Sequence, residues 1–189
     1  MKRADATDAY DARLQAKELI ENFKAGFLTT VQVVQAHVRG DVDIRHVAFI
    51  LRMTMSWIAI SLSKFSEFWA RYGALASPDI AEEAKSILRV IRDRKVDDFR
   101  NTVAAHLLDR GTRNPVPQNQ VQEQLTRIWG GNDPQPFLLW LDDPIDHSPH
   151  TVCATLRRFR AHLKANYELI VPQYVKDAPK LYLAENEDD

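Results

Sequence analysis

The sequence predicts an all-α protein, a bundle of five to seven helices. Apolar residues recur every three or four positions along most of the 189 residues, which is the spacing of one helix face. Glycine is scarce, with 6 residues, and no segment alternates apolar and polar residues as a half-buried strand does. A chain of this length is expected to form one domain, here residues 1–175, followed by an acidic tail at 176–189.

Two long helices are expected first, over residues 12–38 and 44–72. Gly26 lies inside the first helix and weakens it by up to about 1 kcal/mol relative to alanine. Gly40 ends that helix, and Asp41 is the candidate N-cap of the next one. The second helix is the most apolar of the chain, which predicts a central position in the bundle.

Shorter helices are expected in the rest of the chain. Ser77 and Pro78 form a helix start, with serine as the cap and proline in the first turn, and Ser148 and Pro149 repeat the pattern. The apolar run 137–141 is too short to be assigned by its period. The expected helices cover residues 80–91, 96–108, 120–129 and 152–170, with loops at 111–119 and 142–150.

Composition limits the classes of function. With 25 Lys+Arg against 26 Asp+Glu the net charge is −1, which argues against a generic nucleic-acid coat protein. Cys153 is the only cysteine, so no intramolecular disulfide or multi-cysteine zinc site is expected, and a cytoplasmic location is the simplest expectation. The longest uncharged apolar stretch, residues 53–63, is too short to span a bilayer, so no membrane partner is expected.

The segment FRNTVAAHLLD, residues 99–109, carries the most specific pattern in the chain. It places Arg100 and the polar Asn101 ahead of His106, with five residues between the arginine and the histidine. In an all-helical chain this pattern resembles the HEPN superfamily, in particular its abortive-infection and toxin-like members, over about residues 45–165. The resemblance implies a helical domain that dimerises and, in active members, a metal-independent endoribonuclease. Other members of the superfamily act only as binding or assembly domains.

In the implied reaction the RNA 2′-hydroxyl attacks the adjacent phosphorus and leaves a cyclic phosphate. His106 suits the proton transfer because the ordinary histidine pKa, about 6.5, lies near physiological pH. Arg100 suits charge stabilisation because its planar fork binds phosphate oxygens, and Asn101 would orient the phosphate or the imidazole. Asp109, three residues after His106, would set the imidazole tautomer. The alternative interpretation makes Asp109 and Arg110 helix-end charges and His106 a half-buried core residue.

Ideal helix geometry separates the two main residues of this motif. Arg100 and His106 lie about 120° apart around the axis and about 9 Å apart along it. A site that uses both needs a bent arginine side chain, a distorted helix, or a second copy of the motif across a dimer interface. The last option fits the family pattern best, so the composite site requires a homodimer.

The last expected helix carries four cations and no acid between residues 156 and 164, which predicts a phosphate-binding surface. The alternative is that they form the solvated face of that helix. Residues 89–113 carry seven Lys/Arg against four Asp, so the surface near the motif is basic if the two segments share a face. The candidate RNA-binding residues are Arg110, Arg157, Arg158, Arg160 and Lys164.

Residues 142–150 gather three carboxylates and two imidazoles, a conceivable site for a divalent metal. Their spacing matches no standard zinc signature, and turn and cap roles account for several of them. We therefore expect no metal and no other cofactor. The residues concerned are Asp142, Asp143, Asp146, His147 and His150.

Two functions of different class follow from these patterns. The first is a dimeric, metal-independent endoribonuclease of HEPN type, a toxin or defence component, with Arg100 and His106 as the main catalytic residues and Asn101 and Asp109 in support. The second is a catalytically silent helical interaction module with an antitoxin or another protein partner. A third interpretation is an unrelated helical bundle, which would pair Arg100 internally and seal His106 in the core.

Overall fold

The computed structural model describes residues 6–101, 117–131 and 133–167. Within these residues the secondary structure is helical throughout, which confirms the all-α prediction. The run 137–141, left unassigned by its period, belongs to a short helix. The elements are α1 (Ala6–Val38), α2 (Ile44–Tyr72), the 3₁₀ helix η1 (Gly73–Leu75), α3 (Pro78–Asp93), α4 (Val96–Phe99), α5 (Gln118–Trp129), α6 (Gln135–Leu141) and α7 (Val152–Asn166).

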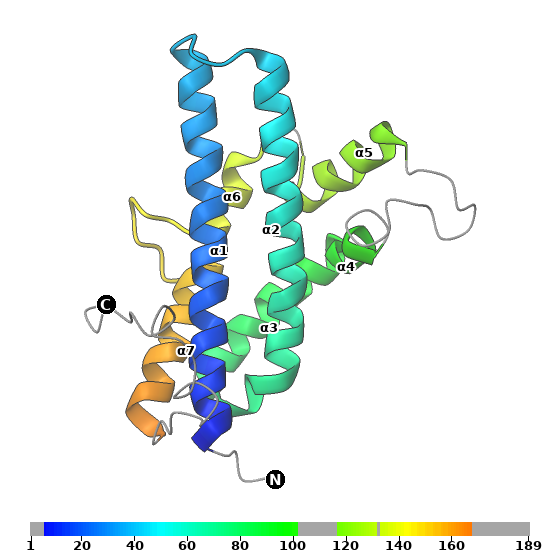
Figure 1. Cartoon of the computed structure of the whole chain (residues 1–189). Helices are drawn as coiled ribbons and strands as arrows, with labels where there is room; N and C mark the ends of the chain where they lie inside the picture. The colour runs from blue at the N-terminus through cyan, green and yellow to red at the C-terminus, as the bar shows by residue number, and fades with distance from the viewer. Residues whose placement is uncertain (1–5, 102–116, 132, 168–189) are drawn as a thin grey trace, which may run out of the picture.

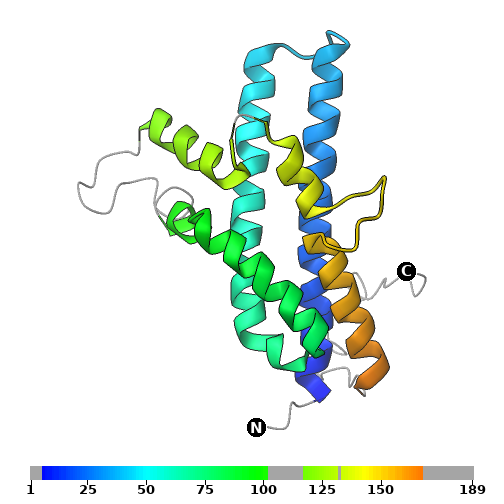
Figure 2. The ribbon, with the colours of Figure 1, turned by 180° about the vertical axis from the view of Figure 1, so that it is seen from behind.

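Helices α1 and α2 form a long antiparallel hairpin, and the other helices pack on one side of it (Figure 1). The view from behind shows α3, α5, α6 and α7 in front of the hairpin (Figure 2). Helix α7 packs mainly on α1, whereas α3, α4 and α5 contact α2. The opposite side of the hairpin is therefore not covered by any of the described helices.

Gly26 lies at a close approach of the two long helices. A Cβ atom at this position would lie 2.6 Å from Cγ1 of Ile58, which is completely buried on α2. The sequence predicts only a weakened helix at Gly26. In the structure this cost is offset, because the absence of a side chain at Gly26 lets α1 and α2 pack closely against each other.

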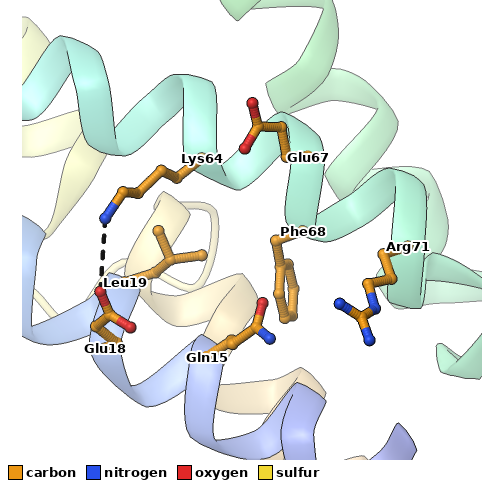
Figure 3. A pocket seen from close by; sticks show the side chains of 7 residues that line it. All are labelled: Gln15, Glu18, Leu19, Lys64, Glu67, Phe68 and Arg71. Atoms are coloured by element: carbon orange, nitrogen blue, oxygen red, sulfur yellow. Dashed lines mark ion pairs between the residues drawn. The ribbon is translucent and has the colours of Figure 1, made fainter.

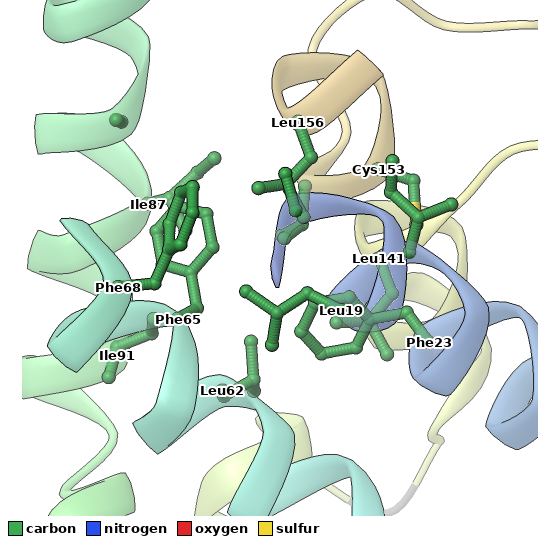
Figure 4. Packing of buried hydrophobic residues seen from close by; sticks show 14 of the residues in the cluster. Leu19, Phe23, Leu62, Phe65, Phe68, Ile87, Ile91, Leu141, Cys153 and Leu156 are labelled. Carbon is green, nitrogen blue, oxygen red and sulfur yellow. The ribbon is translucent and has the colours of Figure 1, made fainter. Parts of the chain in front are cut away.

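The core is formed where the hairpin meets α3, α6 and α7 (Figure 4). Phe65 of α2 is fully buried, and the edge of Phe159 from α7 contacts the neighbouring Phe68, with ring centroids 5.5 Å apart. The thiol of Cys153 is buried in the same cluster, and burial raises its pKa to about 12. The single cysteine is therefore a core residue and an unreactive one.

The turn between α1 and α2 shows that the predicted N-cap of α2 is wrong. The amides of Gly40 and Asp41 donate to the carbonyls of His37 and Ala36 at 2.9 Å, which closes α1 with Gly40 in the left-handed conformation at φ 81°. The cap of α2 is Asp43, whose carboxylate accepts from the amide of Arg45 at 2.8 Å. Asp41 was the wrong candidate because its amide still belongs to the end of α1.

Of the two predicted Ser-Pro starts, the first is confirmed and the second is wrong. Ser77 precedes α3 with Pro78 in its first turn. Helix α7 instead begins after Thr151, whose hydroxyl accepts from the amide of Ala154 at 3.0 Å. The same helix ends earlier than the expected residue 170, because Tyr167 has extended backbone with φ −129° and ψ 140°.

Candidate functional site

Arg100 follows α4 and lies against α2, where it joins a small polar cluster. Its guanidinium forms an ion pair with Glu67 and donates to the hydroxyl of Ser63 at 3.3 Å. Ser63 in turn donates to the carboxylate of Asp97 at 2.6 Å. The cluster fastens α4 to α2, so the arginine of the motif has a structural role in this fold.

The motif is only partly placed by the structure. The side chain of Arg100 is 38% exposed, and Asn101 is exposed beside it. His106, Asp109 and Arg110 lie outside the described residues, so the geometry of the predicted catalytic group stays a prediction. An unrelated helical bundle was expected to pair Arg100 internally and to bury His106 in the core. The internal pairing of Arg100 is present.

Two of the four cations of α7 form ion pairs with carboxylates. One guanidinium nitrogen of Arg157 contacts both oxygens of the buried Asp142, at 3.0 and 3.1 Å. Arg158 pairs with Glu83 of α3 and donates to the carbonyl of Pro149 at 2.8 Å. These contacts hold α7 to α3 and to the loop before it, which favours the solvated-face interpretation over a strip that binds phosphates.

The other two α7 candidates differ in exposure. Arg160 is half-buried, and Lys164 is exposed in the last turn of the helix. Helix α4 lies at the α2 edge of the hairpin and α7 lies at its α1 edge in both views (Figures 1 and 2). Arg100 and the cations of α7 therefore lie at different edges of the bundle.

Arg94, near the end of α3, is a structural cation that sequence reasoning did not single out. Its guanidinium donates to the carbonyl of Ile128 at 2.8 Å and lies over the rings of Phe137 and Trp140, 5.3 and 5.6 Å from their centroids. Burial lowers its pKa from the ordinary arginine value. This residue joins α3, α5 and α6, which accounts for part of the basic excess near the motif.

The acidic and histidine-rich loop at 142–150 is held by turn contacts. Asp142 pairs with Arg157, and the carboxylate of Asp143 accepts from the amides of Ile145 and Asp146 at 3.3 and 3.0 Å. His147 has φ 48°, and His150 is exposed. Among the described residues no three His, Cys, Asp or Glu side chains are grouped so that they could hold a metal ion.

Large apolar side chains are exposed mainly at one end of the hairpin. We define its distal half as residues 28–57, the end that carries the α1–α2 turn. Of the large apolar residues that are exposed in the described chain, Ile145 alone lies outside this region. The distal set is Leu28, Val34, Val38, Ile44, Phe49, Met53 and Trp57, with exposures from 42% to 80%.

The proximal half of the hairpin, the end away from the α1–α2 turn, carries a groove between α1 and α2 that is lined by charged, polar and apolar side chains (Figure 3). The groove has a volume of about 420 Å³, and Phe68 and Leu19 contribute its apolar lining. Glu18 and Lys64 pair across it at 3.6 Å. Its other lining residues are Gln15, Glu67 and Arg71.

The exposed residues of α2 form a second apolar row that the sequence reasoning missed. The expected core row of that helix runs from Ile44 to Tyr72, and its members Val47, Met55 and Ile58 are buried. Ile44 was wrongly assigned to this row, because it is 61% exposed at the start of the helix. Phe49, Met53 and Trp57 follow one another at intervals of four, so they share a different face of the same helix. The signal was present in the sequence, because a helix with one core-facing side does not need this second row.

The apolar character of α2 also bears on the membrane expectation. In the described part of the chain, one helical stretch, Ile44–Leu75, is long and apolar enough to cross a bilayer by length and composition. Within that stretch, 39% of the most apolar window is buried inside the protein. Core helices of soluble proteins have the same composition, and α2 contributes many residues to this core.

No protein-family model and no curated protein matches the chain. Among solved structures, an integron cassette protein from the mobile metagenome of V. paracholerae is similar to it, with a TM-score of 0.70 and 18% sequence identity. The match covers 82% of this chain and 95% of that chain. At this level of identity the similarity shows the helical fold alone.

Proposed function

We propose that this chain is a cytoplasmic helical interaction module that binds another protein chain through the distal half of the α1–α2 hairpin. The observation that carries the proposal is the concentration of exposed apolar side chains in that region, among them Phe49, Met53 and Trp57 at 51–57% exposure. Contiguous exposed apolar surface on a soluble protein marks an interaction site. Aromatic residues and methionine are also enriched at protein interfaces.

The charged groups support a binding role over a catalytic one. Arg100, Arg157 and Arg158 each form an ion pair with a carboxylate of the same chain. A phosphate ligand would have to replace these carboxylates, and α4 and α7 would lose contacts that hold them in place. The module is thus the better supported of the two functions that the sequence predicts.

The test is the size of the assembly that the tagged chain forms in extracts of cells that express it. We expect the chain to elute well above 21.7 kDa, and the Trp57→Glu variant to elute as a monomer. Ile145→Glu is the matched control, because Ile145 is 80% exposed but lies outside the hairpin. Wild-type chain that elutes at the monomer position in extract would contradict the proposal.

The endoribonuclease remains a second candidate because Asn101 and part of Arg100 are at the surface. Purified chain incubated with total RNA in EDTA would then yield ends with cyclic phosphate. His106→Ala would abolish the cleavage, whereas His150→Ala, a change of an exposed loop histidine, would leave it unchanged. Absence of cleavage by the wild-type chain, together with an assembly that depends on Trp57, would favour the module.

A further inference from the structure

The chain beyond residue 167 continues from a point beside the proximal end of α2. Tyr167 directly follows α7, and its hydroxyl donates to the carbonyl of Leu75 at 3.3 Å. Leu75 ends η1, which follows α2 without a gap, so it lies at the end of the hairpin opposite the α1–α2 turn (Figure 1). Residues 168–189 lie outside the described residues, but this contact fixes the place from which they start.

The sequence of residues 168–189 combines apolar groups with a strong acidic charge. It contains six Asp/Glu against two Lys, a net charge of −4, whereas the whole chain has −1. Leu181, Tyr182 and Leu183 form an apolar trio, and four acidic residues follow within residues 185–189. We call residues 168–189 the acidic segment. Such a sequence complements a surface that is both apolar and basic.

The exposed side of α2 has both properties. The helix carries four Lys/Arg and one acidic residue, Glu67, which is paired already. The side chain of Arg45 is 93% exposed, and its carboxylate contact within the described residues is Asp43 at 3.9 Å. Arg52 lies over the ring of Phe49, 5.9 Å from its centroid, and pairs with no carboxylate of the described residues. The exposed apolar residues of the distal half therefore lie beside cations that the described fold leaves largely unneutralised.

The acidic segment is long enough to reach this surface. From Leu75 to Trp57 the distance along α2 is about 27 Å at 1.5 Å per residue. The 15 residues from Tyr167 to Tyr182 extend over up to about 50 Å. The difference of about 20 Å is enough for the chain to pass around the end of the hairpin to the side that no described helix covers.

We propose that the acidic segment binds along the exposed side of α2 of its own chain, with the apolar trio on Met53 and Trp57. The inference rests on the proposed function and adds the regulation of the same site. The acidic segment then covers the residues through which the module contacts its partner. A partner chain therefore binds only when it displaces the acidic segment, so the interaction surface is autoinhibited.

The spacing of charges along the two chains fixes the register. The acidic segment runs from the proximal to the distal half, antiparallel to α2. An extended chain advances about 3.3 Å per residue and a helix about 1.5 Å, so each residue of the acidic segment passes about two residues of α2. With the apolar trio centred on Trp57, Glu185 lies near the level of Arg52. Two residues further, Glu187 lies near the level of Arg45, so both acids meet a cation.

The proximal groove is the poorer site for the apolar trio. Its apolar lining, Leu19 and Phe68, is less than 5% exposed. Lys64 already pairs with Glu18 across the groove at 3.6 Å, and Glu67 adds a second carboxylate to the lining. The groove thus offers an acidic segment little apolar area, whereas the distal half exposes its large apolar side chains.

A weak contact is sufficient because the acidic segment and its site belong to one chain. A segment tethered by a short linker has an effective concentration on the order of 1 mM at its site. A contact with a Kd of about 0.1 mM between separate molecules is therefore occupied in about nine of ten chains. Such occupancy lowers the apparent affinity for a partner about tenfold, since only the open fraction binds.

The first experiment uses the full chain with two introduced cysteines, Met53→Cys and Ala184→Cys, and a short thiol crosslinker at about 1 μM protein. Cys153 is buried and does not compete. The matched control pairs Ala184→Cys with Ile145→Cys, because Ile145 is 80% exposed but lies outside the hairpin. Crosslinking to position 53 should be at least about tenfold faster than to position 145. Equal rates, or a product with the mass of two chains, would overturn the inference.

The second experiment tests the charges. Arg52→Glu should slow the crosslinking between positions 53 and 184 about fivefold, the effect of losing one exposed ion pair. Glu185→Arg in the same chain should restore most of the rate. Lys85→Glu reverses an exposed cation of α3 and is the control that should leave the rate unchanged. A rate that is independent of the charge at position 52 would overturn the proposed register.

The third experiment tests the regulation. Leu181→Asp and Leu183→Asp together remove the apolar contact of the acidic segment without changing the surface of α2. In cell extract the apparent affinity of this variant for the assembly should rise up to about tenfold over that of the wild type. An unchanged affinity would overturn the regulatory role of the acidic segment.

These outcomes separate the inference from the proposed function. Equal crosslinking to positions 53 and 145, together with an assembly that depends on Trp57, would overturn the inference and leave the proposed function in place. The opposite result is selective crosslinking to position 53 with wild-type and Leu181→Asp/Leu183→Asp chains that both stay monomeric in extract. The acidic segment would then cover a surface that has no partner, and the proposed function would fail.

Discussion

The two halves of the α1–α2 hairpin are built from the same two helices, but the rest of the chain covers them differently. Around the proximal half, α3 and α7 bury side chains such as Phe65 and Phe68 completely or nearly so. In the distal half, the α2 residues Phe49, Met53 and Trp57 remain more than half exposed. The comparison shows that helix α2 is apolar on two faces, of which the described fold uses one.

The largest expected effect is the loss of stability when a buried aromatic ring is removed from the proximal half. Phe65→Ala removes a ring that is 0% exposed and should lower the free energy of unfolding by about 3–5 kcal/mol. Phe49→Ala removes the same ring from the distal half, where it is 55% exposed, and should change the stability of the monomer by less than about 0.5 kcal/mol. Urea denaturation of both variants at low protein concentration measures the difference. Equal losses would mean that Phe49 also serves the core.

The second prediction concerns the contact that joins the helices at the border of the two halves. Gly26→Ala improves helix propensity by about 1 kcal/mol but places a Cβ 2.6 Å from Ile58 Cγ1, so we expect a net loss of about 1–2 kcal/mol. Combining it with Ile58→Ala removes the clash, and the double variant should lose less stability than the two single losses together. Additive losses in a double-mutant cycle would contradict the close packing.

The same contrast shows what the sequence could and could not predict. The 3.6-residue period predicted the two long helices and the core row of α2 because buried residues alone impose that period. The second row with Met53 and Trp57 escaped notice because an apolar helix is readily assigned to the centre of a bundle. Propensity did not distinguish Asp41 from Asp43 as a cap, since the choice depends on how many residues the turn after Gly40 consumes.

The candidate site was less predictable than the fold. The spacing of Arg100 and His106 does not reveal that Arg100 pairs with Glu67, because the pairing depends on how α4 is placed against α2. The sequence shows the cations of α7 as a basic strip, but two of them pair with Asp142 and Glu83, which are distant in sequence or belong to another helix. Long-range ion pairs of this kind leave no periodic signal.

A third prediction tests whether these cations are structural. Asp142→Ala removes the carboxylate that binds Arg157, and we expect a loss of about 1 kcal/mol because the arginine is still 43% exposed and can be hydrated. The control is Glu82→Ala, which breaks a pair with Lys85 in which both side chains are at least 65% exposed and should cost less than about 0.5 kcal/mol. Thermal unfolding of the two variants provides the comparison. A neutral Asp142→Ala would leave Arg157 available as a phosphate ligand.

The smallest expected effect lies at the distal tip, where Asp43 caps α2. Hydrogen bonds from His46 and from the amide of Arg45 hold the pKa of this carboxyl below its ordinary value of 3.8. Because the pKa is lower in the folded state, the cap stabilises the fold fully above the unfolded pKa, and the stabilisation is lost as the pH falls through the folded pKa. Asp43→Asn keeps an oxygen that can accept from the amides but does not titrate.

The melting temperatures of wild type and Asp43→Asn should therefore differ most near neutral pH and converge below about pH 4. The convergence is specific to Asp43, since wild type and Asp43→Asn share every other carboxylate. A difference that stays constant from neutral to acidic pH would show that the charge of Asp43 does not contribute to the cap. In that case the distal half would depend on apolar contacts alone, and a partner that covers Met53 and Trp57 would be its main source of added stability.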